Sequence, residues 1–347
     1  MRRSGRIARR LAPAMVLMMA LVILFQGAAG AEMQKYQTAN LELFDTVTVI
    51  IGYAESRETF AETTAQILQE MEEYHRLYDI YHTYEGINNL KTINDAAGGD
   101  PVKVDERIIW LLILARDICE RSGGQVDITM GAVLRLWHEA RTAGLDNPEQ
   151  AALPDPELLA EARKHTGFEL LEIDELAGTV RLTDPEASLD LGAMAKGYAT
   201  QKACENVEGS YLVNVGGNVY ATGPKPDGEP WIVGVRDPDG GAEDYLEAVT
   251  VSRGAVVTSG DYERYYEVDG IRYCHLVDPQ TLMPGTRWRS VTVLHDDSAF
   301  ADELSTALFL MDREAGEKLL RQFGAEACWV TPEGGTEMTE GFHKRLR

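Results

Sequence analysis

The chain has 347 residues, which is enough for one large domain or two modest domains with a buried core. It carries 56 acidic against 33 basic residues, a formal net charge of −23 at neutral pH. A body this acidic is repelled by nucleic acid and by anionic lipid, so general binding to either is excluded.

The N-terminal segment has the composition of an export signal. Several arginines and no acidic residue are followed by an apolar run over 11–25, and small residues then end in an Ala29-x-Ala31 pattern. These three parts are typical of a secretory signal peptide. The apolar run is short for a membrane span, which takes about 20 residues, although an uncleaved anchor is the alternative. We therefore expect 1–31 to be a signal peptide or N-terminal membrane anchor, and 32–347 to be one extracytoplasmic domain.

The four cysteines are widely spaced and contain no CxxC pair, so their spacing does not indicate a zinc site. Disulfides form outside the cytoplasm, but we favour the interpretation that these are single buried thiols. No cysteine lies near residue 31, so a lipid-anchored form has no attachment residue. The cysteines are Cys119, Cys204, Cys274 and Cys328.

The first half of the domain mixes strand and helix patterns. Alternation with β-branched residues predicts a strand over 41–53, and helical spacing predicts a helix over 57–78. Asp105 can cap a second helix that ends at the Gly123-Gly124 pair. The stretch 140–164 is polar and contains several prolines, so it is predicted to run over the surface.

The second half is richer in strands. Asp269-Gly270 between two short β-like runs is a strong hairpin signal. Near the C-terminus, Gly324 is placed to close the last long helix. Because helices and antiparallel strands are mixed without a regular βαβ alternation, the predicted fold class is α+β. The other predicted elements are strands over 170–182 and 188–191, a helix over 194–207, strands within 211–293, helices over 301–311 and on to 323, and a final hairpin.

The segment 188–198 combines a short apolar strand with a turn and the start of a helix. The strand delivers Asp190, and Lys196 lies in the first turn of the helix. Free N–H groups and the helix dipole favour an anion there, and the lysine adds a charge that can reach a phosphate. A simple strand–helix turn with a solvent-reaching lysine explains the same pattern.

Two further clusters are ambiguous when taken alone. Paired glycines within 214–218 allow a ligand or a backbone to approach closely, but a tight hairpin also explains them. The segment 258–262 offers small polar donors at a turn. In 275–279, His275 precedes an Asp-Pro turn, and histidine is well suited to proton transfer near neutral pH. A lone histidine in a strand is nevertheless more often structural.

The segment 301–307 places Asp302 and Thr306 four residues apart on a predicted helix, so both lie on one face. A carboxylate and a hydroxyl are hard oxygen ligands that suit Mg²⁺ with phosphate as a co-ligand. The alternative is that Asp302 is an ordinary acidic residue of a helix N-terminus.

The order and spacing of these clusters resemble the ApbE family, the FAD:protein FMN transferases of bacterial envelopes. The resemblance extends from about Leu43 to Leu320, which is nearly all of the predicted domain. Besides the clusters above, 90–94 and 124–137 look like family motifs.

Members of this family split FAD at the pyrophosphate and transfer FMN to a Thr or Ser hydroxyl of a target protein, releasing AMP, with Mg²⁺ required. Some members mainly hydrolyse FAD to FMN and AMP. The resemblance therefore implies an α+β fold of two lobes with FAD in the cleft. It also implies an acceptor protein with a Ser/Thr motif, for example a subunit of a membrane redox complex. A non-catalytic flavin-binding protein is the third alternative, and the intact ligand residues speak against it.

The resemblance also implies roles for individual positions. Asp302 and Thr306 would bind Mg²⁺, completed by the backbone carbonyl of Ala193 and by Ser305. His275 would be the catalytic proton carrier. The positions that would contact FAD are Phe44, Tyr81, Gln125, Val126, Asp127, Asp190, Lys196, Thr258, Asp261 and Leu276.

Two positions depart from the family's usual pattern. After Asp278-Pro279 the family commonly has Arg-Thr-Gly, whereas this chain has Gln280-Thr281-Leu282. Glycine often serves where φ is positive, so the backbone conformation of the turn at Leu282 is open to question. Phe44 stands where methionine is frequent, which keeps the position hydrophobic.

Overall fold

The structure, a computed structural model, describes residues 32–241 and 244–347. The predicted export signal and its boundary therefore lie outside the described residues. Among the helices of the described ranges, none combines the length and the apolar composition that a membrane crossing requires. All four cysteines are free, and three of them are buried.

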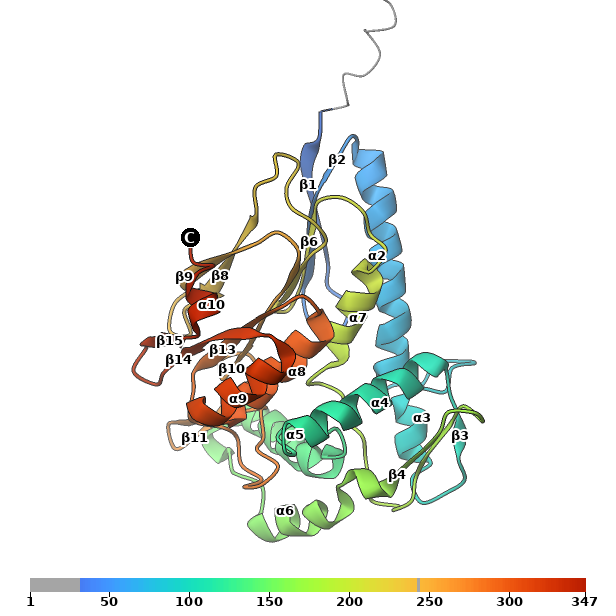
Figure 1. The fold of residues 1–347 in the computed structure, drawn as a ribbon. Helices are drawn as coiled ribbons and strands as arrows, with labels where there is room; N and C mark the ends of the chain where they lie inside the picture. The colour runs from blue at the N-terminus through green and yellow to red at the C-terminus, as the bar shows by residue number, and fades with distance from the viewer. Residues whose placement is uncertain (1–31, 242–243) are drawn as a thin grey trace, which may run out of the picture.

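An eight-stranded sheet forms the centre of the molecule (Figure 1). Its strand order is β1-β2-β6-β7-β10-β13-β14-β15, and every neighbouring pair is antiparallel. Neighbours in space are often distant in sequence, so the sheet gathers segments from the whole chain. The strands are β1 (Gln34–Asn40), β2 (Thr48–Ala54), β6 (Tyr211–Val215), β7 (Asn218–Ala221), β10 (Gly254–Gly260), β13 (Ser290–His295), β14 (Glu326–Val330) and β15 (Thr336–Met338).

Helices cover one face of this sheet, and a hairpin with a short helix covers the other. On the first face, Ile67, Ala203, Leu304 and Leu319 come from four helices and join one core with the strands. Those helices are α2 (Arg57–Tyr78), α7 (Ala195–Cys204), α8 (Ser298–Leu310) and α9 (Arg313–Phe323). The second face is covered by β8 (Trp231–Arg236), β9 (Tyr245–Val251) and α10 (Glu340–His343). Because α8 lies between other elements, it is buried on nearly all sides.

A second group of elements lies below the sheet in Figure 1 and has cores of its own. The lower half of α2 joins one of these cores through Tyr74 and Leu77. The elements are α3 (Leu90–Asp95), β3 (Val102–Lys103), α4 (Glu106–Arg121), α5 (Gly131–Asp146), α6 (Pro156–Ala162), β4 (Leu171–Asp174), β5 (Thr179–Leu182), β11 (Tyr265–Val268) and β12 (Ile271–Cys274), with 3₁₀ turns at Pro148–Gln150, Arg163–His165 and Phe168–Leu170. The mixture of helices and antiparallel strands confirms the predicted α+β class.

Several predicted boundaries are confirmed because local signals determine them. The side chain of Asp105 accepts a hydrogen bond from Arg107 N at 2.9 Å and begins α4. Gly324 adopts φ 67° and closes α9. The β11–β12 turn uses Asp269 at φ 52° and Gly270 at φ 76°, as its sequence predicts.

Two local predictions are wrong. The strand predicted over 41–53 starts only at Thr48, because the preceding residues form a turn. The residues 188–191 form no strand and make only an isolated bridge between Ser188 and Met130. The prediction that 140–164 runs over the surface is confirmed, since most of its residues are exposed, although α5 continues to Asp146 and its Gly144 packs closely against Tyr266.

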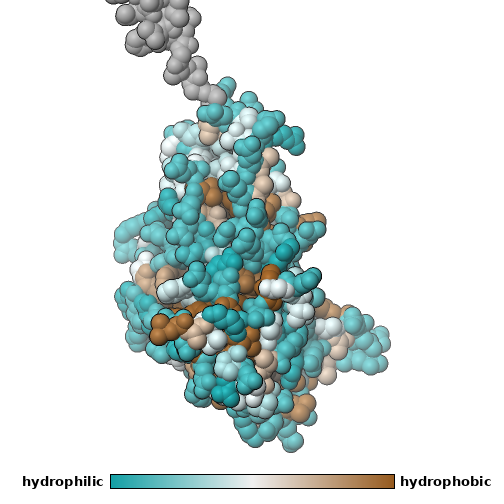
Figure 2. All heavy atoms as spheres, turned by 90° about the vertical axis from the view of Figure 1, so that its right-hand side faces the viewer, coloured by the Kyte–Doolittle hydropathy of each residue, from teal (hydrophilic) through white to brown (hydrophobic). Residues whose placement is uncertain are grey.

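Figure 2 shows one face of the molecule, with hydrophilic residues over most of it and hydrophobic residues gathered in a band near mid-height. The hydrophilic area agrees with the strongly acidic composition. Apolar atoms on part of a surface are normal for a soluble domain, so this view alone indicates no particular partner.

Candidate active site

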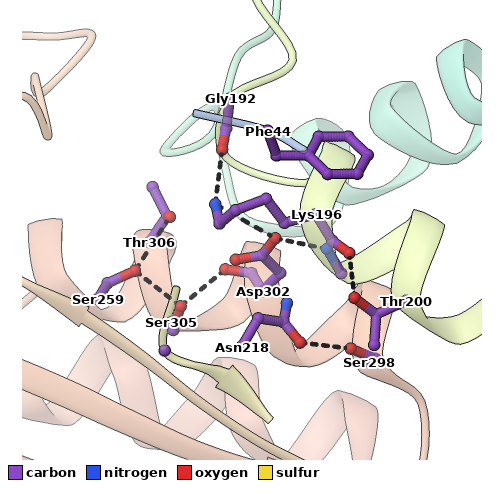
Figure 3. A network of polar contacts seen from close by, with 12 residues as sticks. Phe44, Gly192, Lys196, Thr200, Asn218, Ser259, Ser298, Asp302, Ser305 and Thr306 are labelled. Atoms are coloured by element: carbon purple, nitrogen blue, oxygen red, sulfur yellow. Dashed lines mark hydrogen bonds and ion pairs between the residues drawn. The ribbon is translucent and has the colours of Figure 1, made fainter. Parts of the chain in front are cut away.

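The centre of the site is the contact between α7 and α8 (Figure 3). Asp302 on α8 is 4% exposed, and its Oδ2 accepts a hydrogen bond from Gly197 N at 2.8 Å. A Cβ atom at Gly197 would lie 2.4 Å from the backbone oxygen of Ser298 and 2.5 Å from the Cβ of Asp302. Only glycine therefore lets the two helices approach this closely, and the approach buries the carboxylate beside the start of α7.

Lys196 lies next to this carboxylate. Its Nζ is 3.8 Å from Asp302 Oδ2 and donates to the carbonyl oxygen of Gly192 at 3.3 Å. Burial raises the pKa of Asp302, and the charge of Lys196 with the N–H of Gly197 opposes that rise. The lysine side chain is 24% exposed, so its ammonium group is open to an incoming anion.

Three hydroxyl groups lie on the other side of Asp302. Ser305 Oγ donates to the backbone oxygen of Asp302 at 2.8 Å and lies 2.8 Å from Ser259 Oγ of β10. Thr306 Oγ1 makes only a longer contact of 3.4 Å with Ser259. The Thr306 and Ser305 hydroxyl oxygens therefore each keep a lone pair for another ligand.

These oxygen atoms suit a magnesium ion. Asp302 offers a buried carboxylate with a single cationic neighbour, and Thr306 offers a hydroxyl one helical turn away. Ala193 belongs to the turn that leads into α7. In the described part of the chain, no group of three or more His, Cys, Asp or Glu side chains could hold a metal ion. One carboxylate is a sparse protein ligand set, as expected where substrate phosphates complete the shell.

His275 follows β12 and is partly buried. Its Nδ1 is buried and has no hydrogen-bond partner among the residues that the structure describes. Burial, followed by the charges of Arg264, Lys196 and Arg141, lowers the pKa of His275 to about 3. The imidazole is therefore neutral at physiological pH and able to accept a proton.

Asp190 is acted on by the charges of Lys196 and of basic residues from two other segments. Its Oδ1 accepts a hydrogen bond from Gly192 N at 2.8 Å. Burial raises the pKa of Asp190, and the nearby charges of Arg264, His138 and Lys196 oppose that rise.

A groove of about 980 Å³ includes in its lining two arginines whose charges act on His275. Tyr81 lies in it and is 51% exposed, with its ring 5.7 Å from the ring of His138 on α5. Arg141 and Arg264 line the same groove. Sequence reasoning missed His138, Arg141 and Arg264, because nothing in their local patterns differs from ordinary surface residues.

Phe44 borders the site from the turn before β2, at φ 55°. Its N–H donates to His75 Nδ1 at 3.3 Å, and its carbonyl oxygen accepts from Arg264 at 3.4 Å. The ring lies edge-on to His75 at 5.4 Å. A left-handed conformation at a bulky residue is uncommon and is held here by contacts from distant segments.

Several residues predicted to touch FAD make framework contacts. Asp261 is bound by Arg289 at 2.8 Å and by Arg272 at 3.4 Å. The Thr258 hydroxyl lies 2.8 Å from that of Thr292.

Four more of those positions lie in or beside the core. Asp127 accepts hydrogen bonds from the backbone and side chain of Thr129. Val126 and Leu276 are buried in the same core, and Gln125 Oε1 is buried with no hydrogen-bond partner in the described ranges. The roles of these positions toward FAD stay predictions.

Leu282 adopts φ 60°, where the family pattern commonly has glycine. Its N–H donates to Asp278 O at 2.8 Å, and its carbonyl oxygen accepts from Trp137 Nε1 at 2.9 Å. Leu282 therefore holds a positive φ without glycine, with hydrogen bonds on both sides of the residue.

A buried carboxylate, a lysine at a helix start and an imidazole with an unpaired Nδ1 on one α+β scaffold are the features of an enzyme site. Comparison with known proteins identifies it further. A sequence profile of the ApbE family matches residues 44–329. The chain therefore belongs to the ApbE family and is a transferase, which confirms the resemblance found in its motifs.

Relatives of known function agree with this assignment. A FAD:protein FMN transferase of Treponema pallidum is 36% identical over 277 residues, covering 74% of this chain and 75% of that protein. One from Klebsiella pneumoniae is 30% identical, covering 75% and 73%. Among solved structures, the ApbE protein of Thermotoga maritima has a TM-score of 0.79 at 32% identity, covering 90% of this chain and all of that one. The flavin transferase ApbE of Vibrio cholerae has a TM-score of 0.74 at 25% identity, with the same coverage.

Proposed function

We propose that this protein is a Mg²⁺-dependent FAD:protein FMN transferase that attaches FMN through a phosphoester to a Ser or Thr of an acceptor protein. The observation that carries this proposal is the position of Lys196, whose Nζ lies 3.8 Å from Asp302 Oδ2 and whose charge also acts on His275. Together these groups can balance phosphate charge and take up a proton.

The proposed reaction is a displacement at the flavin-side phosphorus of FAD. The acceptor hydroxyl oxygen forms the new P–O bond, and the bond to the bridging oxygen breaks, so that AMP leaves with that oxygen. The hydroxyl proton passes to the neutral imidazole of His275. Lys196 is placed to balance negative charge on the phosphate oxygens.

His275 is a weak base in the free protein, since its pKa is lowered to about 3. Three cations contribute to that lowering, after burial. The negative charge of bound FAD opposes them, so substrate binding would raise the pKa of His275 toward the range in which it transfers protons efficiently.

In this proposal, Asp302 and Thr306 hold the magnesium ion, with Ala193 O and Ser305 as further oxygen donors. When bound, Mg²⁺ would polarise the phosphate oxygens of FAD and offset their charge. The buried Asp302 carboxylate, beside one lysine and one N–H donor, supports this role.

We also propose an extracytoplasmic location, on the basis of the composition of residues 1–31. The acceptor would then be an extracytoplasmic protein, for example a subunit of a membrane redox complex. A cofactor joined by a phosphoester cannot diffuse away, which is a plain advantage outside the cell.

The decisive test incubates the purified protein with FAD, Mg²⁺ and a candidate acceptor, and measures the acceptor's intact mass and the AMP released. A mass increase equal to attached FMN, with matching AMP, supports transfer. FMN and AMP formed equally with and without acceptor would show a FAD pyrophosphatase instead. FAD binding without AMP under either condition would show a flavin-binding protein.

A further inference from the structure

The groove beside His275 contains two arginines that lack acidic partners. The side chain of Arg141 makes one hydrogen bond, with His138 Nδ1 at 3.1 Å, and that of Arg264 makes one long bond, with Phe44 O at 3.4 Å. Neither forms a salt bridge with an acidic side chain in residues 32–241 and 244–347. This is unexpected in a chain with 56 acidic and 33 basic residues.

The two guanidinium groups are also close enough to repel each other. The pKa of Arg141 is lowered by burial and then by the charge of Arg264. Asp45, Glu263 and Glu267 also line the groove, and the charge of Arg264 acts on Asp190, but in the described ranges no carboxylate forms an ion pair with either guanidinium group. Both guanidinium groups therefore keep donors for a bound anion, and arginine offers a planar pair of donors that matches carboxylate and phosphate oxygens.

The charges of both arginines act on His275. Arg264 and Arg141 both lower the pKa of His275, and Arg264 is the strongest of the charges that do so. Lys196 also acts on His275 and lies at the contact with Asp302. His275 therefore has two sources of positive charge near it, the Lys196 ammonium and the arginine pair of the groove.

Only one of these positive centres lies beside the proposed magnesium ligands. Lys196 is 3.8 Å from Asp302, whereas the arginine pair shares its groove with Tyr81 and His138. His138 keeps its ring near Tyr81, and burial, with Arg141, lowers the pKa of His138. It is thus a neutral hydrogen-bond partner for Arg141 and does not act as a counter-ion.

We propose that Arg141 and Arg264 form an oxyanion-binding subsite in the groove, separate from the Lys196 centre, which binds a phosphate or carboxylate group of a substrate. This inference rests on the proposed transferase function. The oxyanion has two available sources, the phosphate of the flavin donor or a carboxylate next to the accepting hydroxyl of the protein acceptor. Both present oxygen pairs that a guanidinium group binds.

The test uses Arg141→Gln and Arg264→Gln, with Arg135→Gln as the matched control. Arg135 lies on the same helix, α5, but is exposed and does not line the groove. Thermal melting establishes that all variants fold like the parent protein. The first measurement compares binding of FMN and of riboflavin by fluorescence titration without Mg²⁺, because these two ligands differ only by the phosphate.

The second measurement uses fluorescein-labelled decapeptides that contain one serine and, at each other position in turn, either Asp or Asn. Their binding is followed by fluorescence anisotropy. Loss of a charge-assisted hydrogen bond weakens binding about tenfold. If the flavin phosphate occupies the subsite, both groove variants lose about tenfold in FMN affinity and retain riboflavin affinity. If the acceptor carboxylate occupies it, they lose the preference for Asp over Asn peptides and retain FMN affinity.

Two results would overturn the subsite. One is equal affinity of the groove variants and Arg135→Gln for FMN and for the Asp peptides. The other is an equal loss of riboflavin and FMN affinity, which would show contact with the flavin ring instead of an oxyanion. Neither measurement depends on turnover, so failure of the transferase proposal would appear separately, as absent acceptor modification in the mass and AMP assay.

Discussion

Gly197 N donates a 2.8 Å hydrogen bond to Asp302 Oδ2, which joins the first turn of α7 to α8 across 105 residues of sequence. The residue before the glycine is Lys196, whose ammonium group is 3.8 Å from the same oxygen. One carboxylate thus fixes both the backbone of α7 and the position of its lysine. The helix contact and the charge arrangement of the site are therefore one structural feature.

Gly197→Ala is expected to disturb fold and site together. The new Cβ would lie 2.4 Å from Ser298 O, which is backbone and cannot move independently. Overpacking of this kind costs about 1–3 kcal/mol. We expect a lower melting temperature and weaker FAD binding. Gly335→Ala is the control, because the nearest atom to its Cβ is Thr331 Oγ1 at 3.4 Å. Equal melting and FAD binding of Gly197→Ala and the control would contradict the proposed close contact.

Asp302→Asn is expected to abolish activity while keeping the fold. The amide oxygen can still accept the Gly197 N–H, and the substitution removes a charge that burial disfavours. Loss of a centre that stabilises phosphate charge lowers turnover by about 100-fold or more. AMP release from FAD with Mg²⁺ measures this, and EDTA should affect the parent protein but not the variant. Full AMP release by Asp302→Asn would refute the metal assignment.

The pH dependence of kcat/KM should follow the lowered pKa of His275, which is about 3 in the free protein. A lowered pKa means that the neutral imidazole persists as the pH falls through 6.5. The acidic limb of kcat/KM, which reports the free enzyme, should therefore lie well below 6.5. The acidic limb of kcat, which reports the enzyme with FAD bound, should lie at a higher pH than that of kcat/KM, because bound FAD raises the pKa of His275. Rates measured from pH 4 to 9 test this, and a kcat/KM limb at 6.5 would argue against it.

His275→Gln separates binding from proton transfer. Glutamine keeps polar capacity at this position but cannot take up a proton at neutral pH. FAD affinity should stay near that of the parent protein, while turnover falls by about 100-fold or more. Fluorescence titration and AMP release measure the two quantities. Normal turnover of this variant would remove His275 from the mechanism.

Local patterns predicted the parts of the fold that local physics determines. Helix periodicity predicted the full extent of α2, and the Asp269-Gly270 pair predicted the β11–β12 hairpin. The spacing of Asp302 and Thr306 likewise indicated one helix face, because 3.6 residues per turn decide that relation wherever the helix lies.

Contacts between distant segments could not be predicted in this way. Arg141 and Arg264 are separated by more than a hundred residues and meet only because α5 packs against β11. The turn at Phe44 was predicted as strand, since its sequence alternates like one. Its left-handed backbone is held by His75 and Arg264, which lie far away in the sequence.

Glu303 follows Asp302 on α8 but belongs to the core. It is fully buried, and neither carboxylate oxygen has a hydrogen-bond partner in the described part of the chain. Burial raises the pKa of Glu303 well above its ordinary value, and the negative charges of Asp302, Asp117 and Asp297 add to the rise. No catalytic role is needed to explain this residue, and its effect on stability can be measured.

The sign of that effect follows from proton linkage. The unfolded chain loses the Glu303 proton near pH 4.3, whereas the folded protein keeps it to a higher pH, so the free energy of unfolding falls as the pH rises above 4.3.

Glu303→Gln removes this dependence of the free energy of unfolding on pH. At pH 8 the variant should be more stable than the parent, and the two should converge near pH 4. Urea unfolding across this range measures the difference. The exposed Glu62→Gln on α2 is the control and should follow the parent protein at every pH. Parallel stability curves for Glu303→Gln and the parent would show that the Glu303 pKa is not raised.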